Sequence, residues 1–78
     1  MRTHTKDSED EIESHFKSSD IKMCVYNKKT HNLKIYFVKG NIVDYPSVST
    51  DDHRKFVSAP SQGKAFKDYI KKYGVSKK

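Results

Sequence analysis

Two short runs that alternate apolar and polar side chains constrain the fold of this chain more than any other feature. They cover residues 21–26 and 33–38, with a polar break between them that holds two turn-prone asparagines. Successive side chains of a strand point to opposite faces, so a period of two predicts a strand for each run. In the second run, Leu33, Ile35 and Phe37 fall on one face, which we expect to point to the core.

A third strand is predicted over residues 42–45, between a Gly-Asn pair and Pro46. Connections of a few residues between short strands favour an antiparallel meander. The sheet face opposite Leu33 is predicted to be open to water. It carries Lys22, Cys24, Tyr26, Lys34 and Tyr36.

Two helices are predicted after the strands. Ser49 or Thr50 can cap the first, whose initial turn holds two aspartates that suit the positive end of the helix dipole. This helix should end near Ala59, because Pro60 disfavours helix in the residue before it. The second helix can start at Ser61.

The second helix carries a single apolar stripe at i, i+3, i+4 and i+7, formed by Phe66, Tyr69, Ile70 and Tyr73. A meander with one apolar face must be covered, and these two helices are the cover that the sequence offers. The 78 residues therefore predict one α+β domain. It is a three-stranded antiparallel β-meander covered on one face by two C-terminal helices, in the order β-β-β-α-α.

The first part of the chain, residues 1–17, is polar and mixed in charge. Ile12 and Phe16 are its large apolar residues and are spaced i, i+4, and Ser8 with Glu11 forms a capping-box pattern. Two apolar side chains can bury too little surface to hold the segment on a core. We therefore expect this segment to be a flexible or marginally helical acidic leader.

The domain itself is predicted to cover residues 18–75, with a basic tail at residues 76–78. Charge follows this division: residues 1–20 hold three Lys or Arg against six Asp or Glu, and residues 21–78 hold thirteen against four. Such asymmetry suggests a basic body that could meet a polyanion. The alternative is that the lysines only keep a small domain soluble.

Several functional classes find no support in the sequence. A single cysteine, Cys24, excludes an intrachain disulfide, so we expect a reducing compartment, namely the cytoplasm. No stretch has the roughly 18 apolar residues of a membrane span, and no signal peptide is evident. The histidines and Cys24 lack metal-ligand spacing and no nucleophile–base arrangement stands out, so we expect no metal, no cofactor and no enzymatic activity.

A set of residues between Ser18 and Tyr73 forms a longer pattern. It has a Ser-Ser start, a first strand ending in Tyr, an alternating second strand followed by Gly, and a tail of the form Ala-x-Ser-x-Gly-x-x-Phe-x-x-x-Ile with a closing Tyr. The residues that carry it are Ser18, Ser19, Ile21, Tyr26, Leu33, Ile35, Phe37, Gly40, Ala59, Ser61, Gly63, Phe66, Ile70 and Tyr73. This pattern resembles the KTSC domain, a short module named for its occurrence at the C-terminus of some lysyl-tRNA synthetases and also found as small bacterial and phage proteins.

Three positions depart from the family pattern. Val43 replaces the first Tyr of a Tyr-x-Tyr strand, Ser49 replaces the Pro of a Val-Pro corner, and Lys67 replaces the Asn after Phe. The resemblance implies the same order of strands and helices. For function it implies little, because the family is described as of unknown role, with RNA binding proposed from the attachment of the domain to tRNA synthetases.

The last helix also carries a row of lysines. Lys64, Lys67 and Lys71 are spaced i, i+3 and i+7, which places them along one side of a helix, and Lys72 lies beside them. Such a row can follow a phosphate backbone by displacing counterions, without reading bases. The alternative is the solvated face of an ordinary amphipathic helix.

The start of the same helix could bind an anion. Its free backbone N–H groups would point outward at Ser61, and Gly63 would allow a close approach. The spacing of a Walker loop is missing, so nucleotide hydrolysis is not indicated. A simple helix cap is the alternative.

The open sheet face is a second candidate surface. Tyr26 and Tyr36 share it with Lys22 and Lys34, a layout that could stack bases beside phosphate contacts. The alternative is that Tyr is simply favoured in strands.

The sequence thus predicts a small non-enzymatic domain that binds RNA or single-stranded DNA weakly through its Lys-rich C-terminal helix, as an accessory to a larger process. A protein-interaction module with an acidic partner is the alternative. We expect a monomer or weak dimer with no membrane association.

Overall fold

The computed structural model describes residues 2–73. It contains the elements β1 Arg2–Asp7, β2 Glu11–Phe16, β3 Ile21–Asn27, β4 Leu33–Phe37, β5 Ile42–Tyr45, α1 Thr50–Ser58, α2 Gln62–Ala65, a π-helical segment η1 Phe66–Ile70 and a 3-10 turn η2 Lys71–Tyr73. Because α2, η1 and η2 follow one another directly, we call residues 62–73 the C-terminal helix. The predicted basic tail at residues 76–78 lies outside the described residues.

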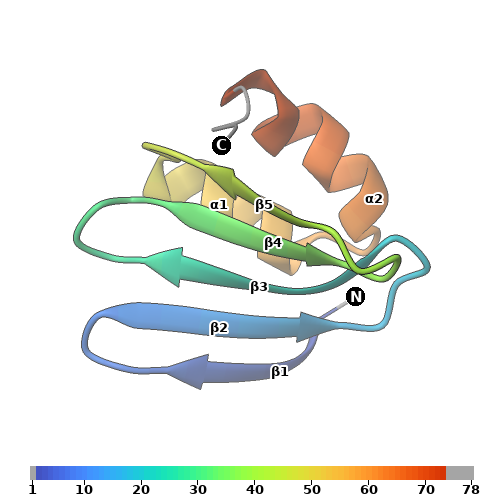
Figure 1. Ribbon diagram of the computed structural model, residues 1–78, viewed down its shortest axis with the longest axis horizontal. Helices are drawn as coiled ribbons and strands as arrows, with labels where there is room; N and C mark the ends of the chain where they lie inside the picture. Colours follow the sequence, from blue (N-terminus) through green and yellow to red (C-terminus); the bar gives the residue numbers. More distant parts are fainter. Residues whose placement is uncertain (1, 74–78) are drawn as a thin grey trace.

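The strands form one antiparallel sheet in the order β1-β2-β3-β4-β5, in which each strand pairs with the next along the chain. In Figure 1, α1 lies behind the strands, the C-terminal helix runs beyond β5, and β1 forms the opposite edge of the sheet. The predicted α+β fold with two helices and an antiparallel sheet is confirmed. The prediction of three strands is wrong, because the sheet has five.

The two additional strands come from the segment before residue 18. The prediction of a flexible or marginally helical leader is wrong, because this segment forms β1 and β2. Ile12 and Phe16 pack on the core side, and a spacing of four residues fits the period of a strand as well as that of a helix. The expected capping pair closes the hairpin turn instead: the Ser8 N–H donates to the Glu11 carbonyl at 2.8 Å.

A β-bulge in β3 reverses the predicted faces of that strand. The register between β3 and β4 shifts between Ile21 and Met23, so Lys22 is the extra residue. Beyond the bulge, Cys24 and Tyr26 lie on the helix-covered face and are 0% and 2% exposed. The prediction that places these two side chains on the open face is therefore wrong.

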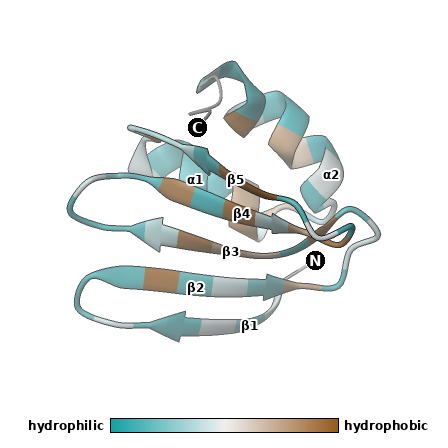
Figure 2. Cartoon of the chain, in the orientation of Figure 1, coloured by the Kyte–Doolittle hydropathy of each residue, from teal (hydrophilic) through white to brown (hydrophobic). Residues whose placement is uncertain are grey.

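The core fills the space between the sheet and the helices. The rings of Phe16 and Phe56 meet edge to face with centroids 5.5 Å apart, and the rings of Tyr26 and His53 stack at 4.1 Å. Figure 2 shows hydrophobic residues on β2 to β5 and on the helices, whereas β1 is teal to white along its length. Burial thus concentrates at β2 to β5, and the described side chains of β1 are exposed.

The helix α1 has the predicted bounds. Ser49 is its N-cap and accepts a hydrogen bond from the Asp52 N–H at 3.1 Å. The helix ends at Ser58, and Ala59 before Pro60 is extended.

The predicted apolar stripe of the C-terminal helix packs on the core. Ile70 is fully buried, and Phe66, Tyr69 and Tyr73 are partly buried against the core cluster. The Lys71 N–H donates to the Phe66 carbonyl, an i to i+5 bond that makes one π-helical turn. This docking fixes which side of the helix faces the solvent.

A tight turn joins β4 to β5. Gly40 has a φ of +107°, a conformation that side chains disfavour. The Gly40 N–H donates to the Phe37 carbonyl at 2.9 Å, which closes the turn and leaves Lys39 exposed beside it.

Candidate nucleic-acid interface

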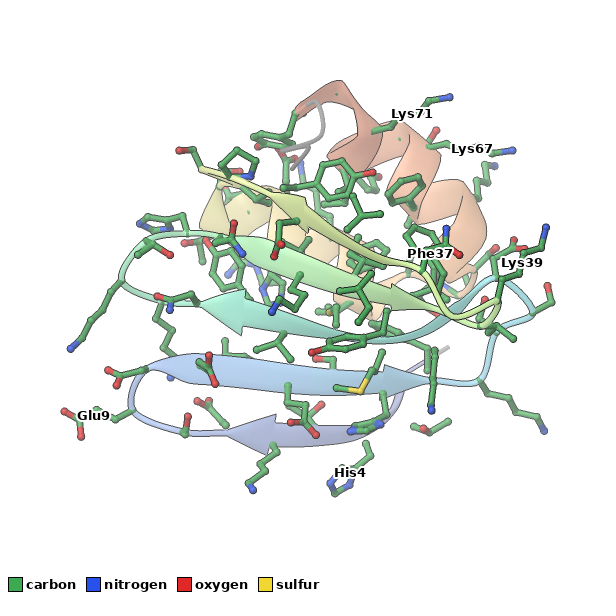
Figure 3. All side chains as sticks on the ribbon, viewed as in Figure 1. His4, Glu9, Phe37, Lys39, Lys67 and Lys71 are labelled. Atoms are coloured by element: carbon green, nitrogen blue, oxygen red, sulfur yellow. The ribbon has the colours of Figure 1, made fainter. Side chains whose placement is uncertain are left out.

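The C-terminal helix carries three lysines that have no carboxylate partner in the part of the chain that the structure describes. Lys64, Lys67 and Lys71 are exposed, and no carboxylate of residues 2–73 lies within 4.0 Å of their ammonium groups. Figure 3 shows the side chains of Lys67 and Lys71 extending away from the sheet. Their charge is therefore available to an external anion.

Lys72 differs from these three. Its Nζ lies 3.1 Å from Asp52 Oδ2, and it sits over the Tyr73 ring at 5.5 Å from the centroid. The Tyr73 hydroxyl also donates to Asp52, and this hydrogen bond, followed by those from Lys72 and Ser49, lowers the pKa of the Asp52 carboxyl against the opposing effect of burial. Lys72 therefore ties the end of the C-terminal helix to the start of α1, so we remove it from the candidate interface.

The structure adds a lysine that the sequence does not single out. Lys39 in the β4–β5 turn borders the same hollow as Lys67 of the C-terminal helix. Figure 3 shows Phe37 and Lys39 at the end of the sheet where the C-terminal helix begins, with Lys67 above them. Sequence reasoning missed Lys39 because only the tertiary fold brings this turn next to the helix.

The hollow beside these lysines has a volume of about 360 Å³. It is lined by Ser19, Asp20, Ile21, Phe37, Lys39, Asn41, Gly63, Phe66 and Lys67. Its aromatic residues, Phe37 and Phe66, are half-buried and meet edge to face with centroids 5.6 Å apart. The site thus combines aromatic rings with two ammonium groups and one carboxylate.

The predicted anion site at the start of the C-terminal helix is disfavoured. Ser61 makes no side-chain capping bond, and α2 itself covers only Gln62–Ala65. Asp20 already approaches this turn: a Cβ built on Gly63 would lie 2.7 Å from Asp20 Oδ2. A carboxylate at this position repels a second anion, so the glycine serves the close approach of Asp20.

The second predicted surface is divided by the bulge. Lys34 and Tyr36 lie on the open face and are half-buried, and Lys22 is exposed at the bulge. Tyr26 points the other way: its hydroxyl donates to the Val48 carbonyl at 2.7 Å inside the core. Tyr26 is therefore unable to stack on a base.

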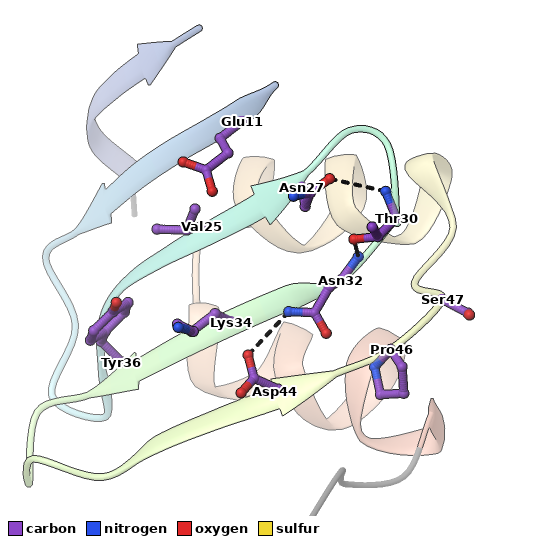
Figure 4. Close-up of a pocket in the computed structure, with 10 residues that line it drawn as sticks. All are labelled: Glu11, Val25, Asn27, Thr30, Asn32, Lys34, Tyr36, Asp44, Pro46 and Ser47. Carbon is purple, nitrogen blue, oxygen red and sulfur yellow. Dashed lines mark hydrogen bonds between the residues drawn. The ribbon is translucent and has the colours of Figure 1, made fainter. Parts of the chain in front are cut away.

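A wide hollow of about 600 Å³ lies on this open face (Figure 4). Lys34 shares it with two carboxylates, those of Glu11 and Asp44. Asp44 accepts a hydrogen bond from Asn32 Nδ2 at 3.1 Å. The face is therefore mixed in charge, which disfavours it as a surface for a polyanion.

The acidic hairpin neutralises other lysines. Asp7 pairs with Lys28 at 2.5 Å and Asp10 with Lys29 at 3.2 Å, which joins the β1–β2 turn to the β3–β4 turn. In Figure 3, Glu9 of the same β1–β2 turn lies at the opposite side of the molecule from Lys67 and Lys71. The acidic hairpin thus leaves the lysines of the C-terminal helix uncovered.

Other chemistry is not evident in the part of the chain that the structure describes. Within residues 2–73, no group of three or more His, Cys, Asp and Glu side chains could hold a metal ion. No helix among these residues has the length and apolar character needed to cross a membrane.

Comparison with known proteins identifies the family of this chain. A family model for the KTSC domain matches residues 17–73, which is more than half of the chain. The chain belongs to the KTSC domain family. Searches of curated proteins and of solved structures found no match.

The two ends of the KTSC pattern meet at the smaller hollow. At the Ser-Ser start, Ser18 Oγ accepts from the Asp20 N–H at 3.2 Å and so shapes the turn before β3. From the tail, Gly63 and Phe66 line the hollow, as does Lys67, which stands where the KTSC pattern has Asn. The hairpin β1–β2 lies wholly outside the matched residues.

Proposed function

We propose that this KTSC domain binds nucleic acid, as RNA or single-stranded DNA, through the surface formed by Lys39, Lys64, Lys67 and Lys71. We call these four residues the lysine surface. The observation that carries the proposal is that the three helix lysines are exposed and have no carboxylate partner within residues 2–73, whereas Lys72 and the lysines of the β3–β4 turn are paired. Counterions released from the phosphates would drive the binding.

Binding should be weak and nearly independent of sequence. Non-specific contacts of this kind have dissociation constants of roughly 10⁻⁴–10⁻⁶ M at physiological salt. Base reading through bidentate hydrogen bonds favours Arg, and Arg54 already pairs with Asp51 at 2.6 Å. The domain would serve as a non-enzymatic accessory to a larger process, and its single cysteine fits the reducing cytoplasm.

The test is a titration of labelled single-stranded RNA and DNA by fluorescence anisotropy at several salt concentrations. Replacing Lys64, Lys67 and Lys71 by Gln should flatten the slope of log K against log salt by about 2 units, because each single-strand phosphate contact contributes ~0.7. The matched control replaces Lys6, Lys28 and Lys29 by Gln, which removes the same charge from the hairpin side. An equal loss of slope in both variants would reject the lysine surface.

The alternative is an acidic protein partner, which the same exposed lysines would also attract. Poly-glutamate added as a competitor, together with nuclease treatment of pull-downs, separates the two. A defined protein retained after nuclease treatment, together with a flat salt response toward RNA, would favour the alternative.

A further inference from the structure

We propose that the hollow between the C-terminal helix and the β4–β5 turn binds one unpaired base of the strand, with flanking phosphates on Lys39 and Lys67. This inference rests on the proposed function and deepens it. It makes the domain selective for single strands, because a base inside a duplex is unable to leave its stack without cost.

The size of the hollow suits a ligand of this kind. Its volume of about 360 Å³ lies near the lower end of the roughly 300–1,000 Å³ typical of small-ligand sites. A long polymer therefore has to enter one unit at a time. The open face offers a larger hollow of about 600 Å³, but its two carboxylates would oppose the phosphates.

The chemistry of the lining matches the parts of a nucleotide. Phe37 and Phe66 supply half-buried aromatic surface, on which a base can stack without regard to sequence. Phe66 is held in place from two sides, because its ring also meets Tyr45 edge to face at 5.6 Å. Lys39 and Lys67 border the same hollow, where their ammonium groups can contact phosphates.

Asp20 adds a preference among bases. Its carboxylate lies against Gly63 at the hollow, and no described residue donates a hydrogen bond to it. A carboxylate accepts from an exocyclic amino group such as cytosine N4, which uracil lacks. Asp20 should therefore favour cytosine over uracil by about fivefold, the size of one net hydrogen bond of ~1 kcal/mol.

The experiment compares three labelled single strands of equal length and charge at one salt concentration: oligo-C, oligo-U and an abasic backbone. The base-bearing strands should bind about 5- to 10-fold more tightly than the abasic strand, because each stacked base contributes favourably. Phe66→Leu should remove most of this advantage and keep the salt slope. Binding of a duplex of the same sequence should not change with Phe66→Leu, because its bases stay in the stack.

Because Phe66 also packs on the core, a second variant avoids any defect in folding. Asp20→Asn changes an exposed side chain to one of the same shape, and it should bring oligo-C and oligo-U to parity or favour oligo-U, since the amide can donate to uracil O4. The matched control is Asp68→Asn, an exposed carboxylate of the C-terminal helix outside this hollow, which should leave the ratio unchanged.

The outcomes separate this inference from the proposed function. Equal binding of abasic and base-bearing strands, with the lysine-dependent salt slope intact, would overturn the base site and leave the lysine surface standing. Absence of binding to every strand at low salt would overturn both.

Discussion

The two ends of this molecule use lysine in opposite ways. At the hairpin end, Lys28 and Lys29 of the β3–β4 turn are paired with aspartates of the β1–β2 turn. At the helix end, Lys64, Lys67 and Lys71 have no such partner among the described residues. The positive charge is therefore concentrated at the helix end, an uneven distribution that the net charge of +6 does not reveal.

The ends differ in burial as well. The C-terminal helix is docked by the fully buried Ile70, whereas the described side chains of β1 are all exposed. A binding surface keeps its geometry only when the element that carries it is fixed. The helix end therefore has both properties of a cationic interface, whereas at the hairpin end the lysines of the β3–β4 turn are paired and β1 has no buried side chain among those described.

The largest expected effect concerns this docking. Ile70→Ala should destabilise the domain by about 2–5 kcal/mol, because it removes a fully buried side chain and leaves a cavity. Ile12→Ala makes the same chemical change at the hairpin end, where the side chain is only partly buried, and should cost less. Urea denaturation followed by circular dichroism measures both. Equal losses would mean that the hairpin is as firmly anchored as the helix.

The features of this contrast that depend on local sequence could be predicted. Those that depend on contacts between separate segments could not. The strands and helices of residues 21–73 follow from local periodicity and capping, and the structure agrees with their order. β1 has no apolar stripe to reveal it, and the spacing of Ile12 and Phe16 fits both periods. The bulge at Lys22 depends on how β3 pairs with β4, which no local pattern encodes.

The same reasoning applies to the candidate site. The helix lysines were predictable because a helix places residues of known spacing on one side. The contribution of Lys39 and the pairing of Lys72 with Asp52 were not, because both depend on contacts between distant segments. The approach of Asp20 to Gly63 likewise joins two ends of the family pattern that are separate in the sequence.

The next effect concerns Asp52, whose pKa is lowered first by the hydrogen bond from Tyr73 and further by Lys72. A carboxyl with a lowered folded pKa stabilises the fold above its unfolded value of 3.8, and this contribution is lost as the pH falls through the folded pKa. Asp52→Asn should therefore cost about 1.5–3 kcal/mol at neutral pH, in the range of charge-assisted hydrogen bonds. The difference from the unaltered chain should vanish in acid below the folded pKa.

Asp51→Asn is the matched control for this pH profile. Asp51 is exposed and pairs with Arg54 across one helical turn, and an exposed ion pair of this kind contributes little to stability. A similar acid-dependent loss in both variants would assign the effect to the helix dipole and not to the contact with Tyr73 and Lys72. In addition, Asp52→Asn frees Lys72 and should steepen the salt slope for single strands by up to ~0.7.

The smallest effects test the hairpin end directly. Replacing Lys28 and Lys29 by Gln should change the stability by less than about 1 kcal/mol per pair, because ion pairs near the surface contribute little, and should leave the salt slope for RNA nearly unchanged. The reciprocal variant, Asp7→Asn with Asp10→Asn, removes the partners instead of the lysines. Because it releases two ammonium groups, it should steepen the slope by up to ~1.4 units, at ~0.7 for each single-strand phosphate contact. If the first variant flattens the slope and the second leaves it unchanged, pairing has no influence on which lysines contact the strand, and the number of exposed lysines alone governs binding.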